Sequence, residues 1–271
     1  MKKTTIEGAL VYFGNSADMS GVADESVQLI VTTPPCGYVP SSHEPSPDAY
    51  GEYISSLCGV IAECVRVLSP DGKLCLHLRP YFEAEHTEDG SRRLTRTVLG
   101  DIERTVLSYP EMYEMSLFVL DCRASSHINS FGSYPYPTKI FSSFPYEWVA
   151  VFAKSGKRTR VPTGEEKENS RISKEEWSSW AVDSVWKIPT VSPKRERHPD
   201  PTHPEIARRL IRMYSFEGDT VLDPYLGSGT TALEALELGR KAIGFEIEES
   251  YLPVIENKLA FASIKQLSLF D

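Results

Sequence analysis

The sequence predicts an α/β protein with a Rossmann-like nucleotide-binding half, and three features near its carboxyl end support this. An apolar strand over residues 220–222 stops at the segment DPYLGSGTT (residues 223–231), whose glycines allow a tight turn. A helix follows and ends at Gly239. A second apolar strand then reaches Glu246, about 20 positions after the turn, the spacing of a ribose-binding carboxylate in such folds.

The chemistry of this glycine turn narrows the class of cofactor. The turn has no third glycine at the dinucleotide spacing and no Lys-Ser/Thr pair to hold a triphosphate. Asp223 at the strand end would repel a pyrophosphate but attract an ammonium group. Thr230 and Thr231 begin the helix, where unpaired N–H groups and the positive end of the dipole face a ligand. S-adenosylmethionine therefore fits better than NAD or ATP, and an ordinary βαβ unit with a packing glycine is the alternative.

A second polar turn follows an apolar strand predicted over residues 27–31. It reads TTPPCGY (residues 32–38). Its two prolines cannot continue a strand, so they hold a rigid, extended turn that offers carbonyls but no N–H donors. A carbonyl beside a hydroxyl can accept both hydrogens of an exocyclic amino group.

Together, the two turns resemble the motifs of the DNA amino-methyltransferases, which methylate N4 of cytosine or N6 of adenine. In that family the amino-group motif is (Asp, Asn or Ser)-Pro-Pro-aromatic, and the cofactor motif is Asp-Pro-Phe-x-Gly-Ser-Gly-Thr-Thr. The cofactor motif is nearly complete here at residues 223–231. The catalytic turn precedes the cofactor loop, which resembles the β-class permutation. The resemblance excludes roughly residues 81–114 and 155–185.

The resemblance implies a Rossmann-like S-adenosylmethionine-dependent methyltransferase fold. The expected sheet has seven strands, is mostly parallel, carries an antiparallel edge hairpin and follows a circularly permuted motif order. Residues 1–154 would form the first part of the catalytic domain, with a variable insertion over about residues 81–114. Residues 155–185 would be the target-recognition segment, and residues 186–271 the second part with the cofactor loop and tail.

Periodicity and composition predict the individual elements. Apolar residues at helical spacing predict a helix over residues 48–68, and residues 96–107 are also expected to be helical. The resemblance implies a further helix over residues 205–214, after the His-Pro segment. Residues 117–120 and 148–152 are expected to form an antiparallel pair at the sheet edge. Residues 124–145 are rich in Ser, Pro, Tyr and Gly, and we expect a long loop there on the DNA side.

The resemblance also implies a set of cofactor contacts. Gly14-Asn15-Ser16 resembles an adenine-contacting Gly-Asp-Ser turn, with an amide in place of the usual acid. The segment from His198 resembles the His-Pro segment that closes over the methionine end. The expected cofactor-binding residues are Asn15, Ser16, Thr32, His198, Asp223, Tyr225, Gly227, Ser228, Gly229, Thr230 and Glu246. No metal is expected, because no histidine or cysteine spacing suggests zinc.

Thr33, Pro34, Pro35, Cys36 and Tyr38 form the expected catalytic set. Thr33 favours cytosine, because adenine enzymes of this family mostly carry Asp or Asn here, whereas N4-cytosine enzymes mostly carry Ser. The expected mechanism is direct methyl transfer to N4 of a flipped cytosine. The Thr33 hydroxyl and the Pro34 carbonyl would accept hydrogen bonds from the amino group, and positioning would supply much of the acceleration.

Cys36 departs from the family pattern and opens alternatives. The family has an aromatic ring here that stacks on the extruded base, and Tyr38 is the candidate substitute. Pro-Pro-Cys also resembles the nucleophile loop of the cytosine-C5 methyltransferases, in which a thiolate attacks the base. No Glu-Asn-Val segment is present, although Glu83 or Glu85 could replace it. Adenine-N6 transfer, an NAD-dependent α/β enzyme and a cofactor-binding protein without catalysis are further alternatives.

The net charge of −9 argues against a uniformly basic DNA-binding surface, so local clusters matter. Lys157, Arg158 and Arg160 form one candidate DNA-binding cluster, and Lys194 and Arg195 form a second. Tryptophans at positions 177, 180 and 186 lie between the two clusters. The expected partner is double-stranded DNA; the alternative is a solvated loop whose tryptophans pack on the body of the protein.

Other partners follow from the resemblance and from the tail. The tail segment Gln266-Leu267-Ser268-Leu269-Phe270 resembles the short peptide by which bacterial proteins dock on the replicative sliding clamp, and a frayed helix end is the alternative. A cognate restriction endonuclease is a further possible partner, unless the protein acts as an orphan methyltransferase.

Length and composition agree with a single enzyme. A chain of 271 residues with 41% hydrophobic content can bury one large core. No apolar run approaches membrane length, and the Met-Lys-Lys start lacks the apolar segment of a signal peptide. Five scattered cysteines suggest free thiols in a reducing compartment. We expect a cytoplasmic, nucleoid-associated protein without membrane contact.

Overall fold

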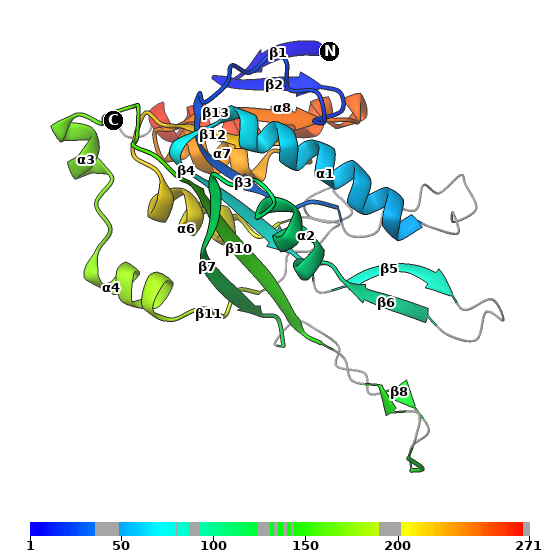
Figure 1. Cartoon of the computed structure of the whole chain (residues 1–271). Helices are drawn as coiled ribbons and strands as arrows, with labels where there is room; N and C mark the ends of the chain where they lie inside the picture. The colour runs from blue at the N-terminus through cyan, green and yellow to red at the C-terminus, as the bar shows by residue number, and fades with distance from the viewer. Residues whose placement is uncertain are drawn as a thin grey trace.

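A nine-stranded mixed sheet forms the centre of the protein in the computed structural model (Figure 1). The structure describes residues 1–35, 49–79, 81–86, 93–123, 131–132, 135–137, 140–141, 144–189 and 202–267. In sheet order the strands are β1 (Lys2–Ile6), β2 (Ala9–Phe13), β13 (Lys241–Glu246), β12 (Thr220–Asp223), β3 (Val27–Thr32), β4 (Leu68–Leu78), β10 (Tyr146–Lys154), β7 (Met112–Asp121) and β11 (Val185–Trp186).

The middle of the sheet is parallel. Strands β2, β13, β12, β3 and β4 all run in the same direction, so their carboxyl ends lie along one edge, which we call the carboxyl edge. Every residue of β3 is buried, as expected for a parallel strand covered on both faces. In open α/β sheets ligands bind outside the carboxyl ends of the strands, so this edge is where a site is expected.

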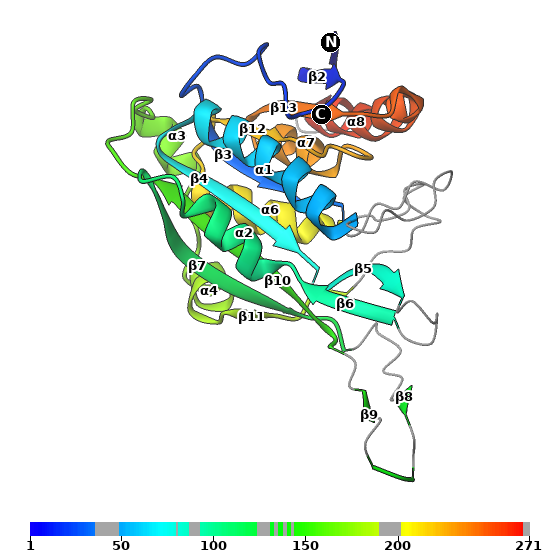
Figure 2. The same cartoon turned by 45° about the vertical axis from the view of Figure 1, so that its right-hand side comes forward.

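Helices cover both faces of the sheet (Figure 2). On one face, α1 (Ala49–Val67) and α2 (Leu99–Val106) pack with Ile30, Leu222 and Phe245. On the other face, helices α6 (Pro204–Tyr214), α7 (Thr230–Glu237) and α8 (Leu252–Leu267) pack with Leu29 and Val31. Alternate residues of β3 therefore enter two separate cores, which is the period of two that a strand imposes.

Two predicted helices are confirmed almost to the residue, and one begins later than expected. Helix α1 matches the helix predicted over residues 48–68, and α6 matches the helix predicted over residues 205–214. Helix α2 begins at Leu99, because β6 (Arg93–Thr97) pairs with β5 (Tyr81–His86) in a separate hairpin. The run LTRT, with one apolar residue and two β-branched threonines, suits a two-stranded ribbon as well as a helix end.

The antiparallel pair expected over residues 117–120 and 148–152 is present as β7 and β10, and both strands are longer than predicted. The pair does not form the sheet edge, because β11 adds beside β7. Strands β1 and β11 lie at the two edges of the sheet, which accounts for nine strands in place of the expected seven. The α/β class and the mostly parallel order are as predicted.

Segments outside the main sheet lie at its two ends (Figures 1 and 2). The β5–β6 hairpin follows β4 beyond the carboxyl edge, and the short pair β8 (Phe131–Gly132) and β9 (Ile140–Phe141) extends from the same side. Helix α3 (Gly164–Asn169) lies at the opposite end of the sheet, and α4 (Lys174–Trp177) lies on the side away from the β5–β6 hairpin. Among the described helices, none is both long and apolar enough to cross a membrane.

Candidate active site

The two polar turns identified in the sequence meet at the carboxyl edge. The Thr32 hydroxyl donates a hydrogen bond of 2.6 Å to Asp223 Oδ1, and both side chains are buried. The backbone N–H of Tyr225 donates to the same carboxylate oxygen at 3.0 Å. Asp223 therefore joins the end of β3 to the cofactor loop after β12. Burial raises the pKa of this carboxyl group, although hydrogen bonds from Thr32, Thr231 and Tyr225 act in the opposite direction.

The glycine turn has the left-handed backbone that its sequence predicts. Gly227 has a φ of 54° and Gly229, at the start of α7, a φ of 91°. Most residues with a side chain are strained in this region, so glycine is required here for the turn itself. The Gly227 N–H donates to Glu246 Oε2 at 2.7 Å, which ties the turn to the end of β13.

Glu246 is buried at the carboxyl end of β13, as the sequence predicts. Its second oxygen accepts a hydrogen bond of 2.9 Å from the Glu248 N–H. Burial raises the pKa of Glu246, and the hydrogen bonds from the backbone N–H groups of Glu248 and Gly227 offset only part of this shift. A carboxylate oxygen can accept more than one hydrogen bond, so both oxygens retain capacity for the hydroxyls of a ribose.

The turn after β2 brings two further predicted residues to this edge. The Gly14 N–H donates to the Glu246 carbonyl at 2.9 Å, so the turn lies beside the ribose-binding candidate. The Asn15 side-chain oxygen accepts from the Ala17 N–H at 2.9 Å, and Ser16 is buried. The amide that replaces the usual acid thus stabilises the turn through its oxygen.

Sequence reasoning missed Lys258, which lies on α8. Its Nζ donates to the Ser228 hydroxyl at 2.8 Å and to the Thr230 hydroxyl at 2.9 Å. No motif marks this lysine, and only the packing of α8 on α7 brings it to the cofactor loop. A lysine on a helix face is usually solvated, so the sequence carries no signal for this contact.

These groups suit S-adenosylmethionine. The Asp223 carboxylate can accept an ammonium group, Glu246 can accept ribose hydroxyls, and Lys258 places a positive charge where a carboxylate would be stabilised. The glycine backbone leaves the turn open to close approach. When bound, S-adenosylmethionine supplies an electrophilic methyl group on a sulfonium.

Thr33 belongs to a hydrogen-bonded chain at the same edge. Its Oγ1 lies 3.1 Å from His77 Nδ1 on β4, and the Thr202 hydroxyl donates to it at 2.8 Å. His77 Nε2 lies 2.8 Å from Glu147 Oε2 on β10. Sequence reasoning missed both His77 and Glu147. A signal was present, because His77 is the one strongly polar side chain in the apolar run LCLHL.

The remaining catalytic candidates divide into two groups. The two prolines directly follow Thr33; Pro34 is buried and Pro35 is exposed. This agrees with a rigid turn at the strand end. Cys36 and Tyr38 lie outside the described residues, and so do His198, Lys194 and Arg195. Their roles stay predictions.

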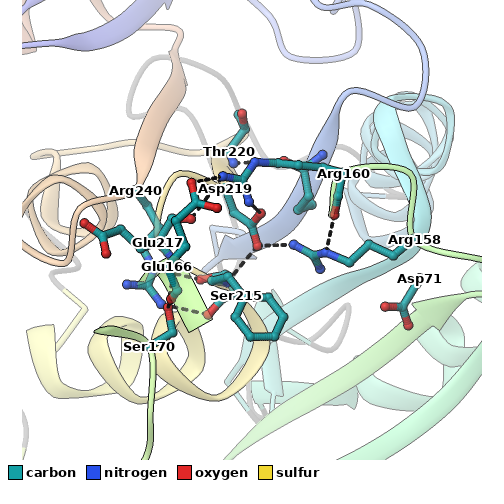
Figure 3. A network of polar contacts seen from close by, with 12 residues as sticks. Asp71, Arg158, Arg160, Glu166, Ser170, Ser215, Glu217, Asp219, Thr220 and Arg240 are labelled. Atoms are coloured by element: carbon teal, nitrogen blue, oxygen red, sulfur yellow. Dashed lines mark hydrogen bonds and ion pairs between the residues drawn. The ribbon is translucent and has the colours of Figure 1, made fainter. Parts of the chain in front are cut away.

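The structure gives Arg158 and Arg160 a role that differs from the predicted DNA contact (Figure 3). The Asp219 side chain is fully buried. Its carboxylate accepts hydrogen bonds from the guanidinium groups of Arg158 and Arg160, and the bond from Arg160 is 2.9 Å long. Arg160 also pairs with Glu166 at 2.5 Å. Asp219 precedes β12 and so lies at the opposite end of that strand from Asp223. These arginines neutralise a buried carboxylate, so the fold gives them a partner other than a DNA phosphate.

Other parts of the predicted target-recognition segment also pack on the body. Trp186 is buried and stacks on Phe118 with ring centroids 4.5 Å apart. Trp180 contacts the guanidinium groups of two arginines on α6. Lys157 is exposed and lies beside Arg158 in the loop after β10, at the end of the sheet opposite the carboxyl edge. The packed-tryptophan alternative therefore describes Trp180 and Trp186. Within the part of the chain that the structure describes, no group of side chains could hold a metal ion.

Comparison with known proteins identifies the family. The family model for N6/N4 DNA methylases matches residues 27–257. The type II methyltransferase M.MjaI of Methanocaldococcus jannaschii is 30% identical over 281 aligned residues, which cover 92% of this chain and 90% of that protein. The DNA adenine methyltransferase YhdJ of Escherichia coli is 26% identical, and the alignment covers 96% of this chain and 84% of YhdJ.

A solved structure agrees with the cofactor assignment. The Thermus thermophilus protein TTHA0409, in complex with S-adenosyl-L-methionine, superposes with a TM-score of 0.74 and 27% identity, and the match covers 93% of each chain. Membership of the N6/N4 family sets aside the cytosine-C5 and NAD-dependent alternatives, since neither belongs to it. The chain belongs to the N6/N4 family of DNA methylases and is an S-adenosylmethionine-dependent DNA methyltransferase.

Proposed function

We propose that the protein methylates N4 of a flipped cytosine at a specific site in double-stranded DNA. The observation that carries this proposal is a neutral hydroxyl, that of Thr33, at the position where adenine enzymes of the family mostly have Asp or Asn. This hydroxyl lies next to the Thr32–Asp223 contact that joins the catalytic turn to the cofactor loop. A base bound there would have its amino group beside the methyl donor.

The chemistry needs acceptors for the amino hydrogens. Resonance draws the nitrogen lone pair of cytosine into the ring, and hydrogen bonds to the Thr33 hydroxyl and the Pro34 carbonyl localise it on nitrogen. Fixed acceptors that do not reorganise during the reaction can supply a large part of the acceleration. Direct transfer requires no covalent bond to the enzyme.

Product analysis tests the target atom. The purified enzyme is incubated with mixed-sequence DNA and S-adenosylmethionine, and the nucleosides are separated against authentic standards by liquid chromatography and mass spectrometry. N4-methylcytosine as the product supports the proposal. 5-Methylcytosine has the same mass but a different retention time, and finding it or N6-methyladenine alone would overturn the proposal. Omission of the methyl donor is the control.

Adenine-N6 transfer is the second candidate function. YhdJ, a DNA adenine methyltransferase, is 26% identical to this chain over most of both lengths. The family motif admits both targets, since both are exocyclic amino groups that need the same two acceptors. The nucleoside analysis above distinguishes the two outcomes in one experiment.

Cys36 has no covalent role in the proposed mechanism. Its replacement by serine is expected to leave methyl transfer within about threefold of wild type, since a change that removes no transition-state contact has a small effect. Complete loss of product in Cys36→Ser, together with covalent trapping of the wild type on fluorinated cytosine, would reject direct transfer.

We propose that DNA approaches the carboxyl edge. The β5–β6 and β8–β9 segments extend from this side, next to the end of β4 (Figure 2). Flipping the target base out of the stack would bring its amino group to Thr33. Lys194 and Arg195 stay proposed phosphate contacts. Residues 123–145 and 81–97 replace residues 155–185 as the proposed target-recognition segments, because Arg158 and α3 lie at the other end of the sheet.

Two partners complete the proposal. The tail with Gln266, Leu269 and Phe270 would dock on a sliding clamp, placing the enzyme at newly made DNA within the nucleoid. Recovery of the clamp by the full chain but not by a variant lacking Leu269 and Phe270 supports this, and equal recovery refutes it.

A cognate endonuclease is proposed because M.MjaI is a type II methyltransferase. Protection of host DNA against one restriction enzyme would support that assignment.

A further inference from the structure

Three side chains on three adjacent strands form a continuous hydrogen-bonded chain behind the target position. Thr33 follows β3, His77 lies on β4 and Glu147 lies on β10. The links are 3.1 Å from Thr33 Oγ1 to His77 Nδ1 and 2.8 Å from His77 Nε2 to Glu147 Oε2. The register of the sheet brings them together, since β10 pairs with β4 on the side away from β3.

The carboxylate at the end of this chain determines which ring nitrogen carries the proton. Burial acts to raise the pKa of Glu147, but the hydrogen bond from His77 and the nearby guanidinium group of Arg79 act in the opposite direction, and the net shift is downward. An ionised carboxylate only accepts hydrogen bonds, so His77 must donate its Nε2–H to Glu147. In the neutral ring, Nδ1 is then an acceptor.

This tautomer sets the role of Thr33. With Nδ1 as an acceptor, the Thr33 hydroxyl donates its only hydrogen to His77. The oxygen has two lone pairs, and the Thr202 hydroxyl donates to one of them at 2.8 Å. One lone pair remains for a hydrogen of the target amino group. Without His77, the Thr33 hydroxyl could rotate and present its hydrogen to the substrate.

We propose that His77, held by Glu147, is a positioning residue that makes Thr33 an acceptor and that takes up the proton released by methyl transfer. The proposal rests on the proposed role of Thr33 and applies to an amino group of either cytosine or adenine. It adds two residues that lie outside the two family motifs.

The proton balance of the step is complete. The sulfur–methyl bond breaks and a nitrogen–methyl bond forms, which leaves the exocyclic nitrogen with a positive charge. That nitrogen gives one proton to Thr33 Oγ1 as the original hydroxyl proton moves to His77 Nδ1. His77 becomes an imidazolium that the Glu147 carboxylate stabilises, and the proton leaves to water after the product dissociates. The same order of groups, a hydroxyl followed by an imidazole and a carboxylate, occurs in other enzymes in which the imidazole takes up the hydroxyl proton.

A purely structural role for the same contacts has to be distinguished. His77 is only 5% exposed, and a buried imidazole needs partners whether or not it moves a proton. Removing it would then lower stability and leave the rate of the folded enzyme unchanged. A proton-accepting role instead lowers the rate with little effect on substrate binding.

His77→Asn separates these roles, because the asparagine oxygen can accept the Thr33 hydroxyl hydrogen but cannot take up a proton. We expect the single-turnover rate of His77→Asn to fall at least about 100-fold, a typical loss for a proton-transfer group. The KM for DNA and the Kd for S-adenosylmethionine should stay within about threefold. Glu147→Gln, which no longer holds an imidazolium, should lose about tenfold or more.

A matched control comes from the other end of β3. Gln28 is also a buried polar side chain, and its oxygen accepts the Thr220 N–H at 2.9 Å far from Thr33. Gln28→Leu should lower the melting temperature without changing the single-turnover rate of the folded enzyme. A His77→Asn enzyme with an unchanged rate would overturn the proposal.

A spectroscopic readout tests the arrangement without turnover. The ¹⁵N chemical shifts of the ring, measured on the wild-type enzyme without substrates, should show His77 protonated on Nε2 and unprotonated on Nδ1. Glu147→Gln should change these shifts, whereas Gln28→Leu should not. A proton on Nδ1 in the wild type would refute the relay. If instead the product proves to be N6-methyladenine, the N4 assignment fails and the relay stands.

Discussion

Asp223 illustrates how one residue can serve both the fold and the site. Its carboxylate accepts the Thr32 hydroxyl and the Tyr225 N–H, so it connects the catalytic turn with the cofactor loop. The same burial that makes these contacts strong opposes ionisation and raises its pKa. A cationic ligand group beside Asp223 would relieve this cost, so its binding is coupled to the charge of this residue.

Asp223→Asn should change how stability depends on pH. In the wild type the folded-state pKa is raised, so the contribution of Asp223 is fully present below its ordinary pKa and is lost as pH rises through the folded value. As the pH rises above about 4, the unfolding free energy of the variant relative to wild type should therefore increase. Denaturant titrations of the ligand-free proteins measure this difference. Asp24→Asn, at an exposed carboxylate, is the control, and parallel curves for Asp223→Asn and wild type would contradict the prediction.

Thr33 provides a second prediction at this scale. Thr33→Ser keeps the hydroxyl and should retain methyl transfer within about threefold, whereas isosteric Thr33→Val should lose at least about 100-fold in turnover. Both variants keep the Thr32–Asp223 contact, so their affinity for S-adenosylmethionine should match wild type. Single-turnover assays and calorimetry provide the two measurements. An active valine variant would show that the amino group does not use this hydroxyl.

At the scale of elements, strand β12 separates two carboxylates with different tasks. Asp223 lies at its carboxyl end in the site, and Asp219 precedes its amino end in an ion-pair network with Arg158 and Arg160 (Figure 3). The network attaches the segment after β10 to the sheet. Its cations therefore stabilise the fold at the end opposite the proposed DNA side.

Arg158→Ala should lower the unfolding free energy by about 2 kcal/mol, the size of a lost hydrogen bond to a charged group. The loss stays this small because Arg160 still donates a hydrogen bond to the Asp219 carboxylate. DNA affinity of the folded variant should not change. Urea denaturation and fluorescence anisotropy measure the two quantities. Exposed Lys157→Ala is the matched control and should stay within about 0.5 kcal/mol of wild type. Weakened DNA binding by a stable Arg158→Ala protein would restore the original DNA-contact assignment.

Helix α8 supplies a further prediction through Lys258. The ammonium group donates to Ser228 and Thr230 at the start of α7, so its loss removes a positive charge from the cofactor loop. Lys258→Met should weaken binding of S-adenosylmethionine about tenfold, which corresponds to about 1.4 kcal/mol. Isothermal titration calorimetry measures the Kd. The neighbouring exposed Glu256→Gln should bind as wild type does, and equal affinities for all three proteins would refute the assignment.

At the scale of the whole molecule, the parallel strands bring both turns to one edge, and helices on both faces stabilise that arrangement. Residues 32–33 and 223–231 are distant in the chain but come from adjacent strands. A ligand that binds across β3, β12 and β13 contacts the centre of the fold. Ligand binding and global stability should therefore be linked.

S-adenosylmethionine at about 100 times its Kd should add about 2.7 kcal/mol of stability, which raises the melting temperature by about 5 to 10 °C for a chain of this size. NAD at the same concentration should give no shift. Differential scanning calorimetry of the wild type measures both. Glu246→Gln, which alters the ribose-binding carboxylate, should show a reduced shift at the same ligand concentration. Equal stabilisation by NAD would contradict the cofactor specificity.

The sequence by itself determined the features that depend on local backbone chemistry. Glycines at positions 227 and 229 have the left-handed φ values that the turn requires, and Glu246 ends the next strand as its spacing predicts. Helix α1 follows from apolar spacing. These outcomes depend on neighbours in the chain, so sequence patterns contain the information.

Tertiary structure alone decided which distant polar groups became partners. His77, Glu147 and Lys258 reach the site through strand order and helix packing, and no spacing rule connects them with Thr33 or Ser228. Arg158 and Arg160 looked like a DNA contact because adjacent cations suggest a phosphate partner, but the fold placed buried Asp219 between them. A charge pairs with whatever group the fold brings near it, and that group is set by long-range topology.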